Sequence, residues 1–289
     1  MSAAPLLLVV LAAILHASWN LLAKRAAPIG PVFVAAYNLV ACIVYAPWAV
    51  ALLLEGAVPF QGAAVSLILL SGLIHLAYSL CLQEGYRQAD FSVVYPVARG
   101  TGPMLSTFGA ILLLGEVPTG RGVLGLALVV IGIGLIATDG RLSGLGRPKG
   151  PIGLLWGMAT GGLIAAYTVT DAYAVKVLGI APVVLDWFSN LLRLVVLAPL
   201  AVANPRRANA AMRGAWPLAV GVGLLSSLSY ILVLDALGRG APLSLVAPMR
   251  EMSMMVGALL GLVVLGEPVG PRRLGGCALL IGGVILLAA

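Results

Sequence analysis

The chain alternates between long apolar runs and short breaks rich in proline, glycine and charge. A helix that crosses the hydrocarbon core of a bilayer needs about 20 residues, and ten of the runs are long enough. Backbone groups in lipid must bond within the segment, which favours helices. We therefore predict an all-α polytopic membrane protein with ten transmembrane helices, over residues 4–23, 31–54, 63–84, 91–114, 120–138, 151–173, 181–203, 216–238, 242–265 and 272–288.

The second half of the chain repeats the first. Four residues recur 152 positions later, namely Tyr78, Arg87, Ser92 and Pro96 as Tyr230, Arg239, Ser244 and Pro248. Arg99 and Glu116 recur after 151 positions as Arg250 and Glu267, so the second copy lacks one residue between its proline and its arginine. The longest break, 139–150, separates two predicted five-helix repeats, 1–140 and 151–289. An odd number of spans in each repeat inverts the second copy, which is a transporter architecture.

Composition supports a membrane protein and excludes a soluble domain. The chain is 61% apolar, only 9% charged and has a mean hydropathy of +1.10, whereas a soluble domain carries about 25% charged residues. The net charge of +7 does not indicate nucleic acid, because the basic residues lie in breaks between spans. The odd-numbered breaks hold 11 lysines and arginines, and the even-numbered breaks hold 3. Because cytoplasmic loops carry the excess of these residues, we predict that the odd-numbered loops are cytoplasmic and that both termini lie outside. The first run, which lacks a basic segment before it, is predicted to be a retained span.

Polar residues within spans should face the bundle interior. His16 and Asn20 lie one turn apart beside Trp19, so they either line a cavity or form a hydrogen-bonded stripe between helices. Tyr78 and Tyr230 are related by the repeat, and they either wall a pocket for an apolar side chain or pack within the bundle.

Helices six and seven also carry polar stripes. Tyr167 and Asp171 share a face, and Asp171 is interpreted as a wetted charge near a helix end, with a proton carrier as the second reading. Asp186, Asn190 and Arg193 share a face and are interpreted as an internally neutralised structural stripe.

Arg99 and Arg250, the two repeat-related arginines inside predicted helices, are the strongest pair of candidates for substrate binding. A fixed positive charge at membrane depth attracts a carboxylate or phosphate, and the alternative is an ion pair with Glu251. Glu116 and Glu267 end their helices beside glycine and are interpreted as loop or gate carboxylates.

The whole chain resembles the EamA family of the drug/metabolite transporter superfamily. The resembling segments are His16-Ala-Ser-Trp-Asn20, Tyr95-Pro-x-x-Arg99 and the two Leu-Gly-Glu helix ends. The resemblance implies two inverted five-helix repeats, a central cavity and export by alternating access. Within that family, the length of the chain and its aromatic-lined helices look like those of the YddG-type exporters of aromatic and other neutral amino acids. Family members are usually drawn with both termini in the cytoplasm, which conflicts with the charge count.

The expected function is export of small amphipathic metabolites, foremost amino acids including aromatic ones. The alternative is a proton-coupled multidrug or cation exporter. No glycine loop, zinc-protease or nucleophile-elbow motif suggests an enzyme, and we expect no cofactor and no metal. We expect a monomer in a bacterial inner membrane, with a small molecule and the bilayer as its partners. The predicted substrate-binding residues are His16, Trp19, Asn20, His75, Tyr78, Tyr95, Arg99, Tyr167, Tyr230, Arg250 and Glu251.

Overall fold

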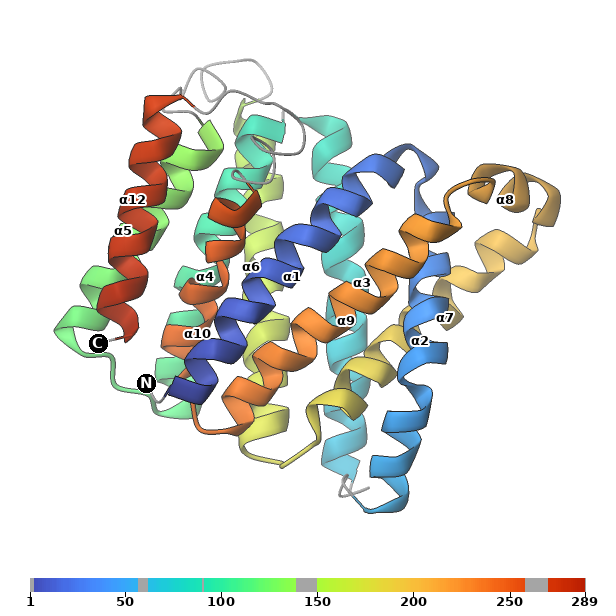
Figure 1. Ribbon diagram of the computed structural model, residues 1–289, viewed down its shortest axis with the longest axis horizontal. Helices are drawn as coiled ribbons and strands as arrows, with labels where there is room; N and C mark the ends of the chain where they lie inside the picture. Colours follow the sequence, from blue (N-terminus) through green and yellow to red (C-terminus); the bar gives the residue numbers. More distant parts are fainter. Residues whose placement is uncertain (1–2, 57–61, 90, 139–149, 258–269, 289) are drawn as a thin grey trace.

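The computed structural model describes residues 3–56, 62–89, 91–138, 150–257 and 270–288. The described chain is a helical bundle (Figure 1). Its helices are α1 (Ala3–Ala26), η1 (Ala27–Ile29), α2 (Pro31–Leu54), α3 (Gly62–Gln88), α4 (Phe91–Leu114), α5 (Gly120–Thr138), α6 (Gly150–Lys176), α7 (Pro182–Val202), α8 (Pro205–Met212), α9 (Trp216–Gly238), α10 (Leu243–Arg250) and α12 (Pro271–Ala288).

Nine helices of the described residues are long and apolar enough to cross a membrane. The predicted helix 242–265 begins as α10, turns at Glu251 and is helical again over 252–257, and its end lies outside the described residues. The N- and C-termini lie at the same end of the bundle (Figure 1). Because an even number of crossings is needed to return the chain to its starting side, this arrangement agrees with ten spans.

The turn at Glu251 lies directly after the place where the second repeat is one residue shorter than the first. The Glu251 amide donates to the Pro248 carbonyl at 3.0 Å, three residues back. A missing residue rotates everything after it by about 100° around the helix axis. Arg250 therefore leaves its helix in a different direction from Arg99, although the two are related by the repeat.

The inversion predicted from the repeat is visible where α5 packs against α12. A Cβ on Gly125 would lie 2.8 Å from the Gly283 carbonyl oxygen, and one on Gly132 would lie 2.7 Å from that of Gly276. The paired numbers run in opposite directions, so the helices are antiparallel. Adding 151 to Gly125 and Gly132 gives Gly276 and Gly283, so the repeat relates the two contacts to each other. Repeats of the same orientation would make these helices parallel, and the inverted arrangement is thereby confirmed.

Small residues also bring α4 and α6 together, along the stripe Gly153-x-x-x-Gly157-x-x-x-Gly161 of α6. A Cβ on Gly157 would lie 2.6 Å from Val97 Cβ. A similar motif, Gly257-x-x-x-Gly261, lies in the second half, and a Cβ on Gly257 would meet no atom of the described residues within 4 Å. Its other member, Gly261, lies outside the described residues.

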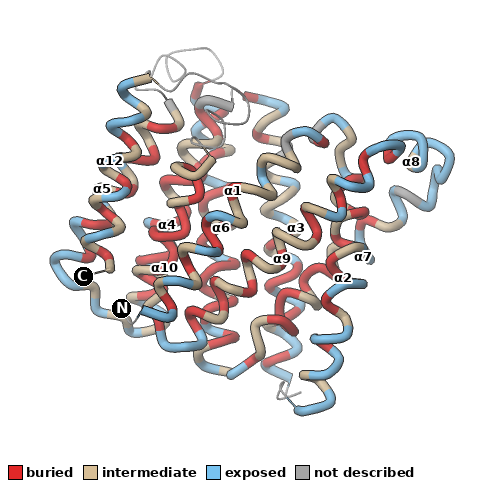
Figure 2. Tube along the Cα trace, viewed as in Figure 1, coloured by how far each residue is buried: buried red, intermediate tan, exposed pale blue. Residues whose placement is uncertain are grey.

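The outer surface of the bundle is apolar, as a lipid-facing surface must be. Leu7, Leu54, Leu112 and Leu113 are all more than 65% exposed, and pale-blue exposed positions follow the outer helix faces in Figure 2. In water, exposed apolar side chains on this scale would form aggregation-prone patches. Two short helices, η1 and α8, occupy breaks that the sequence predicted as loops.

We call the end of the bundle that carries both termini the termini face. Its described connections are 115–119, 177–181 and 239–242, and the opposite end is the far face. Tightly packed side chains from α7, α9 and α10 seal the bundle near the termini face, and each is at most 1% exposed: Val184, Leu185, Leu234, Leu237, Leu243 and Val246.

Candidate functional site

A cavity of about 120 Å³ lies between the two halves of the bundle. Eight of the predicted site residues line it, and they are His16, Trp19, His75, Tyr78, Arg99, Tyr167, Tyr230 and Arg250. Three others do not line it. Asn20 is exposed and donates to the His16 carbonyl of its own helix at 2.7 Å, Tyr95 lies under the Arg99 guanidinium at 6.0 Å, and Glu251 is fully buried.

Arg99 is neutralised across the interface between the halves. Its Nε lies 2.9 Å from Oε2 of Glu251, and both side chains are at least nine-tenths buried. A guanidinium nitrogen also donates to Ser253 at 3.3 Å and lies 3.5 Å from Nε2 of His16. The ion pair predicted for Glu251 therefore forms mainly with the arginine of the other repeat and not with its sequence neighbour.

Arg250 is buried without an equivalent partner. Its Nε lies 4.0 Å from Oε1 of Glu251 and has no hydrogen-bond partner among the described residues. Its guanidinium lies 6.0 Å from the Tyr167 ring centre. The repeat explains the imbalance, because the position equivalent to Glu251 in the first half is Gly100. Among the described residues, these two buried arginines therefore share the Glu251 carboxylate, and Arg250 has the longer contact with it.

Aromatic rings form the wall beside Arg250. The Tyr167 ring lies 4.1 Å from that of His75, 5.6 Å from that of Tyr78 and 6.1 Å from that of Tyr230, centre to centre. The pairs are tilted or edge-to-face, as aromatic quadrupoles favour. The repeat partners Tyr78 and Tyr230 thus reach the same cavity from opposite halves.

Asp171 corrects our interpretation of a wetted helix end. It is 0% exposed and lies inside α6, which continues to Lys176, three residues beyond its predicted end. Tyr230 donates its hydroxyl to Oδ2 of Asp171, and Nε2 of His75 lies 3.8 Å from the same oxygen. A buried charge needs such partners.

The polar stripe on α7 is internally paired, as predicted, and it also lines the cavity. Asn190 donates to Asp186 at 2.8 Å and to Ser227 at 3.1 Å, and it accepts from Arg193 at 2.8 Å. Sequence reasoning missed its contribution to the wall. It also missed several polar lining residues, namely Tyr37, Ser79, Ser226, Ser227 and Ser229. The dense serines just before Tyr230 in an apolar helix were the available signal.

The comparison with known families decides the identity of the fold. Residues 3–138 and 151–289 each match the EamA-like transporter family. The chain belongs to that family. EamA-like proteins are transporters, and this one is a multi-pass membrane protein with an all-α, two-repeat fold. The YddG-type subdivision is not established by this match.

A solved structure shares the EamA-like fold. A crystal structure titled only as that of a protein aligns with this chain at a TM-score of 0.78 and 17% sequence identity. The alignment covers 99% of this chain and 96% of the chain in that crystal structure. At this identity the likeness shows the fold alone. A search among curated proteins found no match.

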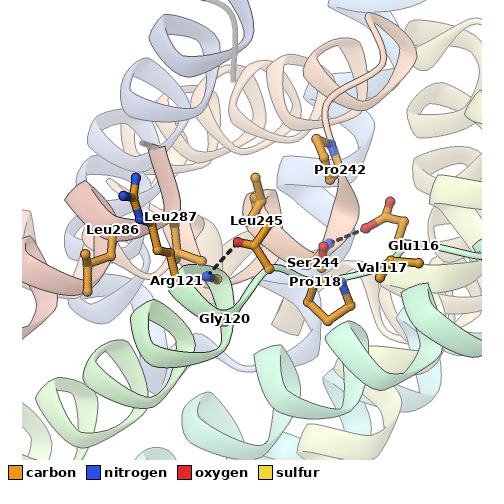
Figure 3. A pocket seen from close by; sticks show the side chains of 12 residues that line it. Glu116, Val117, Pro118, Gly120, Arg121, Pro242, Ser244, Leu245, Leu286 and Leu287 are labelled. Carbon is orange, nitrogen blue, oxygen red and sulfur yellow. Dashed lines mark hydrogen bonds between the residues drawn. The ribbon is translucent and has the colours of Figure 1, made fainter.

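The EamA-like bundle has a second hollow, of about 810 Å³, at the termini face (Figure 3). Glu116 lies at its edge, and its carboxylate accepts from the Leu243 amide at 2.7 Å and from the Ser244 amide at 2.9 Å. Nζ of Lys176 donates to the same carboxylate at 2.9 Å and to the Ala241 carbonyl at 3.0 Å. We call these contacts the Glu116 latch. It joins the first half to the N-terminus of α10 in the second.

The latch favours the ionised carboxylate. Burial alone would raise the pKa of Glu116, but the amides of Ser244 and Leu243 and the Lys176 ammonium outweigh burial and hold this pKa below its ordinary value. Unsatisfied amides at a helix N-terminus are a natural partner for an anion. Its repeat partner, Glu267, lies outside the described residues.

Proposed function

We propose that this EamA-like protein exports small amphipathic metabolites that carry a carboxylate, foremost amino acids including aromatic ones. The observation that carries the proposal is Arg250, a buried cation on the wall of a tyrosine-lined cavity between the halves, whose contact with Glu251 is 4.0 Å long. A substrate carboxylate there would supply the counter-charge that Gly100 does not. Buried charges without partners are costly, so the free site favours an anion.

The remainder of the cavity suits an amphipathic molecule. The rings of Tyr78, Tyr167 and Tyr230 offer apolar faces for a side chain, and Asp186 offers a carboxylate for an amino group. Arg99 is held by Glu251 and Ser253, so we assign it to joining the halves and Arg250 to holding the substrate.

Alternating access would proceed by rocking the two halves against each other around this site. The packed side chains near the termini face and the Glu116 latch close that end in the present conformation. Release of the latch would separate the 115–119 connection from the N-terminus of α10 and begin to open the termini face.

The proposal is tested by transport into proteoliposomes made with purified protein. The substrates are labelled phenylalanine, 3-phenylpropanoate, which lacks the amino group, and phenethylamine, which lacks the carboxylate. We expect Arg250→Gln to reduce uptake of both carboxylates far more than uptake of phenethylamine. Arg239→Gln, which removes an exposed arginine outside the cavity, is the matched control. An equal loss for all three substrates would remove Arg250 from substrate recognition.

A second candidate is a proton-coupled exporter of cationic drugs, favoured by two buried carboxylates, Asp171 and Asp186. Quaternary ammonium dyes in the same liposomes separate the two candidates. Transport of the dyes without transport of phenylalanine would favour the second. For either candidate we place a monomer in a bacterial inner membrane, which chemical crosslinking and membrane fractionation check.

A further inference from the structure

A buried cluster next to the cavity is not used by carboxylate binding. It consists of Asp171 on α6, His75 on α3 and Tyr230 on α9. Nε2 of His75 lies 3.8 Å from Oδ2 of Asp171, and the Tyr230 hydroxyl donates to the same oxygen. Asp171 is 0% exposed and His75 only 8%. The cluster therefore joins two groups that bind protons across two halves of the bundle.

The cluster has free positions for a proton. Oδ1 of Asp171 and Nδ1 of His75 both lack a hydrogen-bond partner among the described residues. His75 and Tyr230 line the cavity whereas Asp171 does not, so the imidazole stands between the carboxylate and the cavity. This arrangement gives a proton a route from the cavity to a carboxylate that lipid and water do not reach.

The repeat does not reproduce this cluster in the other half of the bundle. Asp171 corresponds to Trp19, and His75 corresponds to Ser227. A carboxylate thus occurs at one of two related places, as the carboxylate of Glu251 does. A purely structural role would be served by an uncharged side chain at lower cost.

Charged and titratable groups on the surrounding elements bear on this cluster, with His16 on α1 and Tyr78 on α3 among those that line the same cavity. Others are Tyr167 on α6 itself, Arg99 on α4 (which is held by Glu251), Asp186 and Arg193 on α7 (which are joined through Asn190), and Arg250 on α10. Among the described residues, Arg250 has no ion pair closer than its 4.0 Å contact with Glu251. A proton on the cluster neutralises the Asp171 carboxylate and so makes the surroundings of Arg250 more positive by one unit.

We propose that Asp171 and His75 form a proton-binding site whose occupancy is linked to the substrate. One proton, which passes through His75, enters to give Asp171 carboxylic acid beside neutral imidazole, and it leaves to give carboxylate beside neutral imidazole. An anion at Arg250 and this proton bind cooperatively. A ligand ammonium group and this proton compete. For a substrate whose ammonium group competes with the proton more strongly than its carboxylate cooperates with it, binding exchanges a proton for substrate, which lets an inward proton gradient drive export.

The coupling to substrate rests on the proposed function, so the test has two parts. The first measures Kd for 3-phenylpropanoate and phenethylamine between about pH 6 and about pH 8.5, where both probes keep their charges. We expect acidification to tighten the carboxylate and weaken the amine, each by about 5-fold to about 150-fold, the usual range of coupling between two sites. Asp171→Asn keeps the shape and the Tyr230 hydrogen bond and is expected to abolish both trends. Asp235→Asn, at an exposed ion pair, should retain them.

The second part needs no ligand. Infrared difference spectra of the protein should show a protonated carboxyl band that appears on acidification and is missing from Asp171→Asn. Absence of that band from the wild type, or its persistence in Asp171→Asn, overturns the proton site. Binding of both probes with no pH trend overturns the coupling and leaves the proposed function standing. Failure of both probes to bind overturns the proposed function, and the infrared band alone then decides the proton site.

Discussion

Removing the Glu116 carboxylate should open the termini face. Glu116→Gln keeps the shape of the side chain but replaces one acceptor oxygen by an amide group that cannot accept from a backbone N–H. At least one of the two bonds to Leu243 and Ser244 is lost, and the ion pair with Lys176 as well. A hydrogen bond to a charged group contributes about 1.5–3 kcal/mol, and the ion pair, with side chains 12% and 21% exposed, at most about 1 kcal/mol. A loss of about 2 kcal/mol lowers the ratio of latched to unlatched protein about 30-fold.

Spin labels across the termini face measure that ratio. Cysteines replace Val117 and Arg239, which are exposed and lie on opposite halves, in a background that lacks Cys42, Cys81 and Cys277. Pulsed dipolar spectra in nanodiscs should show a longer distance component that grows in Glu116→Gln. The matched control is Glu84→Gln, which removes a carboxylate from an ion pair with Arg87 near the far face. Identical distance distributions in all three proteins would refute the latch.

The latch should also release in acid. Because the pKa of Glu116 in the latched state lies below its ordinary value, its contribution is fully present above about pH 4.3, the ordinary Glu value, and is lost as pH falls through the lowered pKa. Wild-type protein titrated to acid pH should therefore approach the Glu116→Gln distribution. That variant should not respond at residue 116, and an equal acid response in both proteins would place the titrating group elsewhere.

Three further outcomes follow from the packing and the ion pairs. Gly132→Ala puts a Cβ 2.7 Å from the Gly276 carbonyl oxygen and should lower stability by about 1–3 kcal/mol. Gly282→Ala is the control, because its Cβ would meet no atom of the described residues within 4 Å. Thermal unfolding in detergent compares the two variants, and equal melting temperatures would contradict the close approach of α5 and α12. Glu251→Gln leaves both arginines uncompensated and should tighten binding of carboxylate probes while lowering the melting temperature; weaker carboxylate binding at full stability would show that Glu251 itself contacts the substrate. Because α10 carries the latch at one end and Arg250 at the other, a carboxylate probe that shifts the spin-label ratio toward the latched form should bind Glu116→Gln more weakly, and one that shifts it toward the unlatched form should bind that variant more tightly.

Local periodicity was sufficient to predict the helices and their inversion. Apolar run lengths placed nine of the spans, and the shared Arg–Glu spacing of 17 residues identified the repeat before any contact was known. These signals are local or depend on matching one segment with another. They need no knowledge of which side chains meet in space.

The pairing of charges could not be predicted in the same way. Glu251 adjoins Arg250 in sequence, but neighbours on a helix point in different directions, and its closer partner is Arg99, 152 residues earlier. Asp171 was misread for a smaller reason. The predicted helix ended at residue 173 and the real one ends at Lys176, and those three residues move Asp171 nearly one turn inside.

The asymmetry between the repeats is what turns a symmetric scaffold into a site. An inverted repeat with identical halves would place the same charges at related positions, and both arginines would have a carboxylate or neither would. One missing residue before Arg250, glycine in place of a second Glu251, and aspartate in place of a second Trp19 break that symmetry at the cavity. The contacts between α5 and α12, away from the cavity, preserve the symmetry of the repeat. The residues that depart from the repeat are therefore the ones to mutate first when substrate recognition is sought.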